Sequence, residues 1–272
     1  MVGANPKKEL GQHWLYDSDV LEAMCDAIEL KTGDEVLEIG PGLGTLTARL
    51  LDRHCIVWAL EFDAVLARDL IKNVVRQQKE NDLLDHSDSL TVVEGDIRTY
   101  NFSTMPVKYK VCANIPYYLT SNLIRLLCDT PNQPVSVAIL VQKEVAQRVV
   151  AKSGKMSILS CVAQFYYECT LGEIVPAKLF TPPPKVDSQI LIMKRREKPM
   201  FDVDTKQFFK LIKAGFGEKR KTLRNSLSGG LVLGKDEVVA LLVKSSVDPM
   251  ARAETLSLED WQRIYSTYAK SL

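Results

Sequence analysis

The segment Asn114-Ile115-Pro116-Tyr117 places two hydrogen-bond acceptors and an aromatic ring directly after an apolar run. The exocyclic amine of a nucleobase is a poor nucleophile, because its lone pair is delocalised into the ring. The Asn114 side-chain oxygen and the Ile115 carbonyl could both accept from such an amine and direct its lone pair at an incoming group. Pro116 restricts Ile115 to an extended backbone, and Tyr117 offers a face on which an extruded base can stack. The segment is also a common turn sequence, but at the end of a strand it predicts chemistry on a base amine.

A second motif, Glu38-Ile39-Gly40-Pro41-Gly42-Leu43-Gly44, follows another apolar run. Alternate glycines let a backbone turn sharply and approach a ligand without interference from Cβ atoms. A dinucleotide fingerprint would need glycine where this chain has Thr45, so a pyrophosphate ligand is disfavoured. The same pattern is also typical of an ordinary turn between a strand and a helix.

Acidic residues end the next two apolar runs. Glu61 lies about 20 residues beyond Gly40, where a carboxylate in this type of sheet accepts hydrogen bonds from ribose hydroxyls. Asp96 ends the third run and could accept from the exocyclic amine of adenine. Together with Glu38, these carboxylates suit a cationic cofactor better than an anionic one, and S-adenosylmethionine is the leading candidate.

These residues must be positioned by apolar, β-branched runs that alternate with helical patterns. We predict strands at Glu35–Gly40, Ile56–Phe62, Leu90–Glu94, Tyr109–Ala113 and Val135–Val141. Such an alternation predicts an α/β fold with a mostly parallel, doubly wound sheet. Several runs are apolar at consecutive positions, so helices should cover both faces of the sheet.

The pattern changes toward the C-terminus. A proline-rich turn, Thr181–Pro184, precedes one more strand-like run, Lys185–Met193, and from about Asp202 only helical patterns follow. Two apolar stripes mark these helices: Phe209, Ile212 and Phe216, then Trp261, Ile264, Tyr265 and Tyr268. We therefore expect a large α/β domain over residues 1–198 and a small all-α domain over residues 199–272.

Composition excludes several classes of protein. The chain has 272 residues, of which 46% are hydrophobic and 25% charged, which is enough to bury a full core. Its apolar runs are far shorter than a membrane span, and no signal peptide precedes them, so we expect a cytosolic protein. The six cysteines form no CxxC pair and there are only three histidines, so neither a metal site nor a disulfide is expected.

Basic residues are concentrated in one segment. Residues 185–224 carry 12 Lys and Arg against 5 Asp and Glu, although the whole chain has a net charge of only +1. Lysines on an amphipathic helix are also typical of a solvated face, but here adjoining clusters favour contact with a polyanion. The candidate RNA-binding residues are Lys194, Arg195, Arg196, Lys206, Lys210, Lys213, Lys219, Arg220, Lys221 and Arg224.

The chain resembles the ribosomal RNA adenine N6,N6-dimethyltransferase family over nearly its whole length. The motifs that carry the resemblance are Leu10–Leu15, Glu38–Gly44, Glu61–Asp63, Gly95-Asp96, Asn114–Tyr117, Phe180–Ser188 and Phe216–Leu223. The family often has Asn-Phe or His-Phe where this chain has His13-Trp14, and its members are usually more basic overall.

The resemblance implies a class I, Rossmann-like methyltransferase domain, a small helical domain that recognises rRNA, and a role in small-subunit biogenesis. It implies cofactor contacts from His13, Leu15, Gly40, Glu61, Asp96 and Asn114; Glu38 and Gly42 of the glycine-rich turn complete the predicted cofactor-binding set. It also implies that Phe180 presents a second aromatic ring to the target base, opposite Tyr117. The predicted catalytic set is therefore Asn114, Ile115, Pro116, Tyr117 and Phe180.

Three functions remain open from the sequence. The leading prediction is a monomeric enzyme that transfers methyl groups from S-adenosyl-L-methionine to N6 of two adjacent adenosines near the 3′ end of small-subunit rRNA. A second is a non-catalytic RNA-binding assembly or transcription factor on the same fold. A third is an enzyme that methylates adenine in large-subunit rRNA or in DNA.

Overall fold

The computed structural model describes residues 6–7, 10–80, 85–218 and 220–270, and it divides into two compact units. The first unit comprises Met1–Ala146 and Glu168–Arg195, and the second comprises Gln147–Tyr167 and Arg196–Leu272. The sequence led us to expect that everything up to residue 198 would form one domain. Residues 147–167 instead group with the helical unit, because Met156, Cys161 and Phe165 belong to its hydrophobic core.

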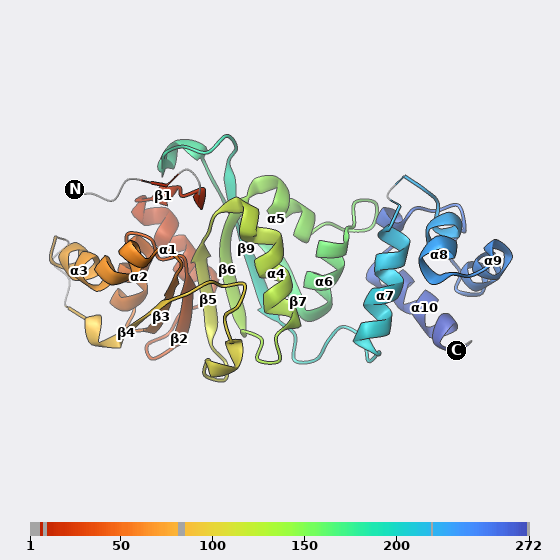
Figure 1. The fold of residues 1–272 in the computed structure, drawn as a ribbon, viewed down its shortest axis with the longest axis horizontal. Helices are drawn as coiled ribbons and strands as arrows, with labels where there is room; N and C mark the ends of the chain where they lie inside the picture. Colours follow the sequence, from red (N-terminus) through yellow and green to blue (C-terminus); the bar gives the residue numbers. More distant parts are fainter. Residues whose placement is uncertain (1–5, 8–9, 81–84, 219, 271–272) are drawn as a thin grey trace. The chain divides into compact units, whose positions relative to one another are not determined.

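The first unit is built on a seven-stranded sheet with the order β4-β3-β2-β5-β6-β9-β7 (Figure 1). Its strands are β2 (Glu35–Ile39), β3 (Ile56–Glu61), β4 (Leu90–Glu94), β5 (Lys110–Asn114), β6 (Ser136–Gln142), β7 (Tyr167–Val175) and β9 (Ser188–Arg195). Strands β2 to β6 pair in parallel, and β9 pairs antiparallel to β6. The predicted mostly parallel sheet is confirmed, and each of the five predicted parallel strands lies within one residue of its expected bounds.

Helices cover both faces of this sheet. Helices α1 (Ser18–Ala27), α2 (Thr45–Asp52) and α3 (Ala64–Glu80) pack side by side and share a hydrophobic core with β2, β3 and β6. Helices α4 (Thr120–Asp129) and α5 (Lys143–Val149) follow β5 and β6. Residues Val137 to Val141 of β6 are completely buried at consecutive positions, which is the burial expected for a strand covered on both faces.

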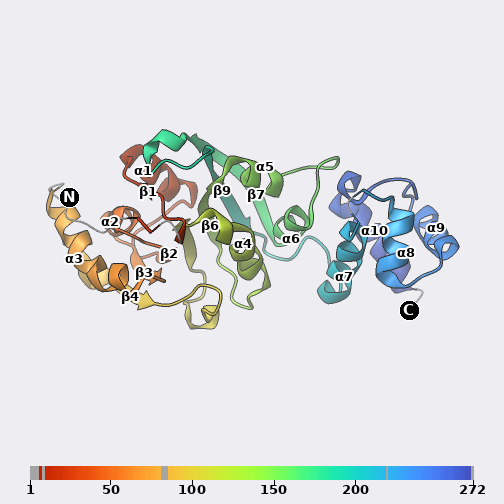
Figure 2. The same ribbon diagram turned by 45° about the horizontal axis from the view of Figure 1, so that its top comes forward.

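Two short strands bring distant segments to the carboxyl edge of the sheet. Strand β1 (Trp14–Leu15) pairs antiparallel with β8 (Phe180–Thr181), so that Leu15 lies opposite Phe180. The Thr45 hydroxyl at the start of α2 donates a hydrogen bond to the Leu15 carbonyl at 2.9 Å, and Figure 2 shows β1 passing close to α2. Thr45, which stands where the dinucleotide fingerprint would have glycine, therefore holds the N-terminal segment in place.

The second unit is helical. It contains α6 (Ile158–Tyr166), α7 (Thr205–Phe216), α8 (Leu223–Leu231), α9 (Lys235–Lys244) and α10 (Leu258–Ala269). Both units also contain short 3₁₀ helices. Those of the first unit are η2 (Ser87–Ser89), η3 (Phe102–Thr104), η4 (Tyr117–Leu119) and η5 (Ala177–Leu179), and η6 (Ala253–Thr255) belongs to the second.

The core of the second unit is aromatic and closely packed. Phe165, Phe208 and Trp261 are completely buried. A Cβ atom on Gly215 would lie 2.2 Å from Cη2 of Trp261, so only glycine allows α7 and α10 to pack this closely. Of the expected α7 stripe, Ile212 is completely buried as predicted, whereas Phe209 and Phe216 pack at the edge of the core and Phe208 is buried instead.

Three classes of feature are absent from the part of the chain that the structure describes. No described helix combines the length and the apolar content needed to cross a lipid bilayer. The six cysteines are free thiols, and no three His, Cys, Asp or Glu side chains among the described residues gather where they could hold a metal ion.

Candidate active site

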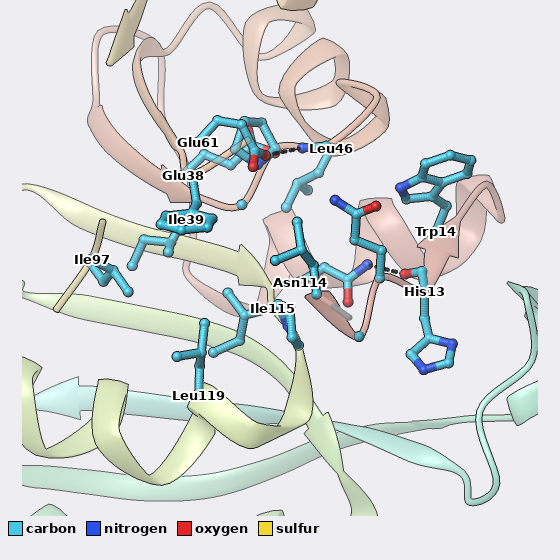
Figure 3. Close-up of a pocket in the computed structure, with 18 of the residues that line it drawn as sticks. His13, Trp14, Glu38, Ile39, Leu46, Glu61, Ile97, Asn114, Ile115 and Leu119 are labelled. Atoms are coloured by element: carbon cyan, nitrogen blue, oxygen red, sulfur yellow. Dashed lines mark hydrogen bonds between the residues drawn. The ribbon is translucent and has the colours of Figure 1, made fainter. Parts of the chain in front are cut away.

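All of the predicted cofactor-binding and catalytic residues line one pocket at the carboxyl ends of β2, β3, β4 and β5 (Figure 3). They are His13, Leu15, Glu38, Gly40, Gly42, Glu61, Asp96, Asn114, Ile115, Pro116, Tyr117 and Phe180. Parallel strands bring Glu38, Glu61, Asp96 and Asn114 together, because the carboxyl ends of such strands meet at one edge of the sheet. The antiparallel pair of β1 and β8 brings together the segments around Leu15 and Phe180, which are far apart in the sequence. The pocket lies entirely within the first unit.

The glycine-rich turn forms one wall of the pocket. Gly40, Gly42 and Gly44 have φ angles of 69°, 58° and 85°, in the left-handed region that favours glycine. A Cβ atom on Gly44 would also lie only 2.7 Å from Cγ2 of Val74 in α3. The turn therefore needs glycine both for its backbone angles and for the close packing of α2 against α3.

Glu61 is held by backbone donors at the end of β3. Its Oε2 accepts from the Gly42 N–H at 3.0 Å and its Oε1 accepts from the Asp63 N–H at 2.9 Å. Burial raises the pKa of the Glu61 carboxyl, and these two backbone hydrogen bonds oppose the rise. Asp63 in turn forms an ion pair with Lys7 at 2.6 Å, so the N-terminal segment is tied to the same edge of the sheet.

Glu38 lies beneath the glycine-rich turn with only 1% of its surface exposed. Its Oε2 atom has no hydrogen-bond partner, although it is buried and belongs to a pocket-lining residue. Burial raises the pKa of Glu38 to about 8; the side chain and backbone of the neighbouring Thr47 oppose the rise, and the Glu61 carboxylate adds to it. An unpaired buried acceptor of this kind is costly unless a ligand supplies a donor or a positive charge.

The raised pKa of Glu38 predicts a stability effect that depends on pH. The folded state keeps the proton up to about pH 8, whereas the unfolded chain loses it near pH 4.3, so folding stability falls between these values by about 1.4 kcal/mol per pH unit. Glu38→Gln does not titrate. Its free energy of unfolding relative to wild type should therefore rise by about 1.4 kcal/mol between pH 6 and pH 7.

Urea denaturation of both proteins at each pH measures this difference. Glu94→Gln, which replaces an exposed carboxylate at the end of β4, controls for the loss of an acidic residue. A constant difference between Glu38→Gln and wild type across this range would mean that Glu38 is already ionised in the folded protein.

Asn114 is the last residue of β5, and its side chain is oriented by the N-terminal segment. Its Nδ2 donates to the His13 carbonyl at 3.5 Å, which leaves Oδ1 to accept from a ligand (Figure 3). The His13 ring points away from Asn114, and its Nδ1–H donates to the Pro182 carbonyl at 2.7 Å. His13 therefore faces Asn114 with its backbone rather than with its side chain.

Tyr117 is held on both its ring and its hydroxyl. Its ring stacks on His13 with centroids 5.8 Å apart and planes inclined by 22°. Its hydroxyl shares a hydrogen bond of 2.7 Å with Oγ of Ser188, a residue with no exposed surface. Phe180 also lines the pocket, and it belongs to the same core cluster as Leu15, with 3% of its surface exposed.

Comparisons with known proteins identify the family of this chain. The family model described as ribosomal RNA adenine dimethylase matches residues 3–270. The chain belongs to the ribosomal RNA adenine dimethylase family. It is 42% identical over 264 residues to ribosomal RNA small subunit methyltransferase A of Dehalococcoides mccartyi strain BAV1, covering 97% of this chain and 88% of the relative. It is 41% identical to the protein of the same name in Trichormus variabilis, with 94% and 95% covered.

Solved structures show the same fold. The 23S rRNA methyltransferase ErmE superposes with a TM-score of 0.73 and 26% identity, covering 93% of this chain and 98% of that one. A dimethyladenosine transferase from Plasmodium falciparum superposes with a TM-score of 0.77 and 25% identity, covering 95% and 98%. The predicted combination of a class I methyltransferase fold and a helical C-terminal region is therefore confirmed for this adenine dimethylase.

Sequence patterns alone did not assign several residues that line the pocket of this adenine dimethylase. The polar or aromatic ones are Gln12, Trp14, Thr45, Phe62, Arg98 and Tyr118. Most of them neighbour a motif residue, so adjacency was an available signal, but it does not reveal which way a side chain points. Trp14 is notable because its Nε1 is buried without a hydrogen-bond partner.

The predicted RNA-binding residues fall into two groups. Lys194 and Arg195 belong to the first unit and have structural partners: Lys194 pairs with Glu29 at 2.7 Å, and Arg195 donates to the Gln133 carbonyl. The others belong to the second unit, where Arg196 donates to the Gln164 carbonyl and Arg224 is half-buried. Lys206, Lys210, Lys213, Arg220 and Lys221 are exposed, and Lys219 lies outside the described residues.

Proposed function

We propose that this protein dimethylates N6 of two adjacent adenosines near the 3′ end of small-subunit rRNA, with S-adenosylmethionine as methyl donor, during assembly of the small subunit in the cytoplasm. The observation that carries the proposal is the position of Asn114 and Tyr117 in the same pocket as the glycine-rich turn. One part of this pocket suits a methyl donor and the other suits a base amine. The names of the relatives at about 40% identity favour the small subunit as the substrate.

The residues of the pocket fit S-adenosylmethionine. The left-handed turn at Gly40 and Gly42 brings backbone close to the ligand, and the unpaired Oε2 of Glu38 is a buried acceptor that a cationic ligand would stabilise in its ionised form. Glu61 would bind the ribose and Asp96 the adenine, as acidic residues at strand ends do in open sheets. When bound, this cofactor supplies an electrophilic methyl group.

The chain's own residues prepare the target amine. In the first transfer Oδ1 of Asn114 and the carbonyl of Ile115 accept the two N6 hydrogens, which draws the nitrogen lone pair out of conjugation with the ring. In the second transfer one of these acceptors binds the single hydrogen that remains on N6. The Asn114 amide is oriented for this because its Nδ2 donates to His13. No general base is needed before transfer, because the attacking amine is neutral and becomes acidic only when the nitrogen gains positive charge.

Two other functions are less well supported. ErmE, a 23S rRNA methyltransferase, shares the fold at 26% identity, so large-subunit rRNA is the main alternative substrate. A non-catalytic assembly factor would have no need for the pocket-lining acceptors Glu38, Asn114 and Ile115.

The decisive assay is transfer of radiolabelled methyl groups from S-adenosylmethionine to undermethylated small subunits, to large subunits and to DNA. We expect label only in the small subunits, with four methyl groups per particle in two dimethyladenosines after hydrolysis to nucleosides. Preferential labelling of large subunits or DNA would assign the enzyme to a different substrate, and no labelling of any substrate would favour the assembly factor.

The exposed lysines of α7 are the part of the helical unit that we propose contacts rRNA. Lys206, Lys210 and Lys213 are spaced i, i+4 and i+7 and all are exposed, so they form one basic face. Because phosphate contacts release counterions, replacing the three by alanine should reduce the slope of log affinity against log salt by about 2 to 3.

A matched control exists on α3. Lys72, Arg76 and Lys79 have the same spacing and are also exposed, so their replacement removes the same charge from another helix. Filter binding to small-subunit rRNA over a series of salt concentrations compares the two triple variants. Equal slopes for both would mean that the α7 lysines are only a solvated face. Sedimentation of the protein alone also tests the predicted monomer.

A further inference from the structure

Arg98 holds the Asp96 carboxylate through a network of hydrogen bonds. Oδ1 of Asp96 accepts from the Arg98 backbone N–H at 2.9 Å and from Nε at 3.0 Å. Oδ2 accepts from Nε at 2.9 Å and from Nη2 at 2.5 Å. The backbone donor alone would fix Oδ1, so the guanidinium is what fixes Oδ2 and with it the plane of the carboxylate.

This pair lies at the pocket and not on a remote surface. Asp96 and Arg98 both line the pocket, as does the buried Ile97 between them. Figure 3 shows Ile97 on the side of the pocket away from His13 and Trp14. Asp96 directly precedes Ile97 in the chain, and it is the residue to which we assign the adenine of the cofactor.

Stability does not account for this contact. The side chains of Arg98 and Asp96 are 58% and 23% exposed, and exposed ion pairs contribute little to folding because water and salt screen them. A forked arginine does, however, impose a direction on the carboxylate that a point charge such as lysine does not. The contact with Arg98 should therefore affect the binding of a ligand that donates a hydrogen bond to the Asp96 carboxylate in one particular orientation.

We infer that Arg98 is a positioning residue that aims the Asp96 carboxylate at the exocyclic amine of the cofactor's adenine and so determines selectivity for adenine over a deaminated base. This inference rests on the proposed function, because it assigns the adenine to Asp96. The same contact holds the pKa of the Asp96 carboxyl below its usual value. An ionised carboxylate is an acceptor only, which suits an amine and opposes the carbonyl oxygen of hypoxanthine.

Calorimetric titration with two ligands tests the inference. S-adenosylhomocysteine carries the amine and S-inosylhomocysteine carries a carbonyl in its place. Arg98→Ala should weaken binding of S-adenosylhomocysteine by about 3- to 10-fold, on the scale of one charge-assisted hydrogen bond, and should leave S-inosylhomocysteine within about 2-fold of wild type. Arg98→Lys should resemble alanine, since it keeps the charge but loses the fork.

Arg68→Ala is the matched control. Arg68 forms a similar exposed pair with Asp69, with Nε to Oδ1 at 3.1 Å and Nη2 to Oδ2 at 3.3 Å, on α3 and outside the pocket-lining set. It should bind both ligands like wild type. In an Asp96→Asn background, Arg98→Ala should have no further effect on S-adenosylhomocysteine, because the two residues act through one contact.

The possible failures are distinguishable. If Asp96→Asn weakens S-adenosylhomocysteine but Arg98→Ala does not, the inference is wrong and the proposed function stands. Equal weakening of both ligands by Arg98→Ala, or effects that add to those of Asp96→Asn, would make Arg98 a general structural residue and also overturn it. Failure of the wild-type protein to bind S-adenosylhomocysteine would remove the proposed cofactor and the inference together.

Discussion

Asn114→Ala is expected to lower the single-turnover rate of methyl transfer by about 10²- to 10³-fold, the scale of losing one preorganised hydrogen-bonding group at the site where charge develops. The variant lacks the acceptor Oδ1 and also the Nδ2 donor that reaches the His13 carbonyl. Loss of Oδ1 removes an acceptor from the amine as it becomes positively charged, and the Nδ2 donor is the group that orients this acceptor in the wild-type protein. Quench-flow measurement on undermethylated small subunits at saturating S-adenosylmethionine isolates this step from cofactor binding.

Asn114→Asp separates the two roles of the amide. The variant keeps acceptor oxygens but has no hydrogen to donate to the His13 carbonyl. Its carboxylate is therefore not oriented as the Asn114 amide is. We expect a rate between those of alanine and wild type. A rate for Asn114→Ala within 3-fold of wild type, which is about 0.7 kcal/mol, would show that the Ile115 carbonyl or another group activates the amine without Asn114.

Strand positions were predictable because parallel strands buried on both faces have continuous apolar runs. Val135–Val141 is such a run, and β6 was predicted within one residue at either end. Strand β7 was missed for the converse reason. It is at the end of the strand order, and most of its residues are exposed or half-buried, so it carries polar residues and Gly172 where an apolar run would have marked it.

The site was predictable to the extent that motifs end strands. Glu38, Glu61, Asp96 and Asn114 follow or end apolar runs, and parallel pairing brings such ends to one edge of a sheet. The directions of side chains were not predictable. Nothing in the sequence indicates that His13 turns its ring toward Pro182, or that Arg98 folds back onto Asp96, because these contacts depend on backbone geometry that only the folded chain has.

The grouping of residues 147–167 with the helical unit was also beyond the sequence. Their helix α6 is apolar on most sides, so its pattern does not say which core it joins. Aromatic contacts of Phe165 place α6 in the core of the helical unit. Its ring centroid lies 5.4 Å from that of Phe208 and 5.2 Å from that of Phe209, residues about 40 positions later in the chain. Long-range pairing of this kind leaves no local periodic signal.

Tyr117→Ala is expected to lower methyl transfer by about 5- to 150-fold, because stacking contributes about 1–3 kcal/mol per base. The affinity for S-adenosylmethionine should stay near that of wild type, since the ring is assigned to the target base. Tyr117→Phe keeps the ring and should remain active. The structure adds a complication, because the hydroxyl shares a hydrogen bond with Ser188 and phenylalanine would leave the fully buried Ser188 hydroxyl unpaired.

Ser188→Ala resolves that complication. It removes the same hydrogen bond of 2.7 Å from the other side and leaves the tyrosine ring and hydroxyl in place. If the hydroxyl serves only to hold the ring, Tyr117→Phe and Ser188→Ala should lower the single-turnover rate equally, by about 10-fold at most, the scale of one neutral hydrogen bond. A Tyr117→Phe rate as low as that of Tyr117→Ala, with Ser188→Ala near wild type, would make the hydroxyl itself the functional group and refute the stacking account.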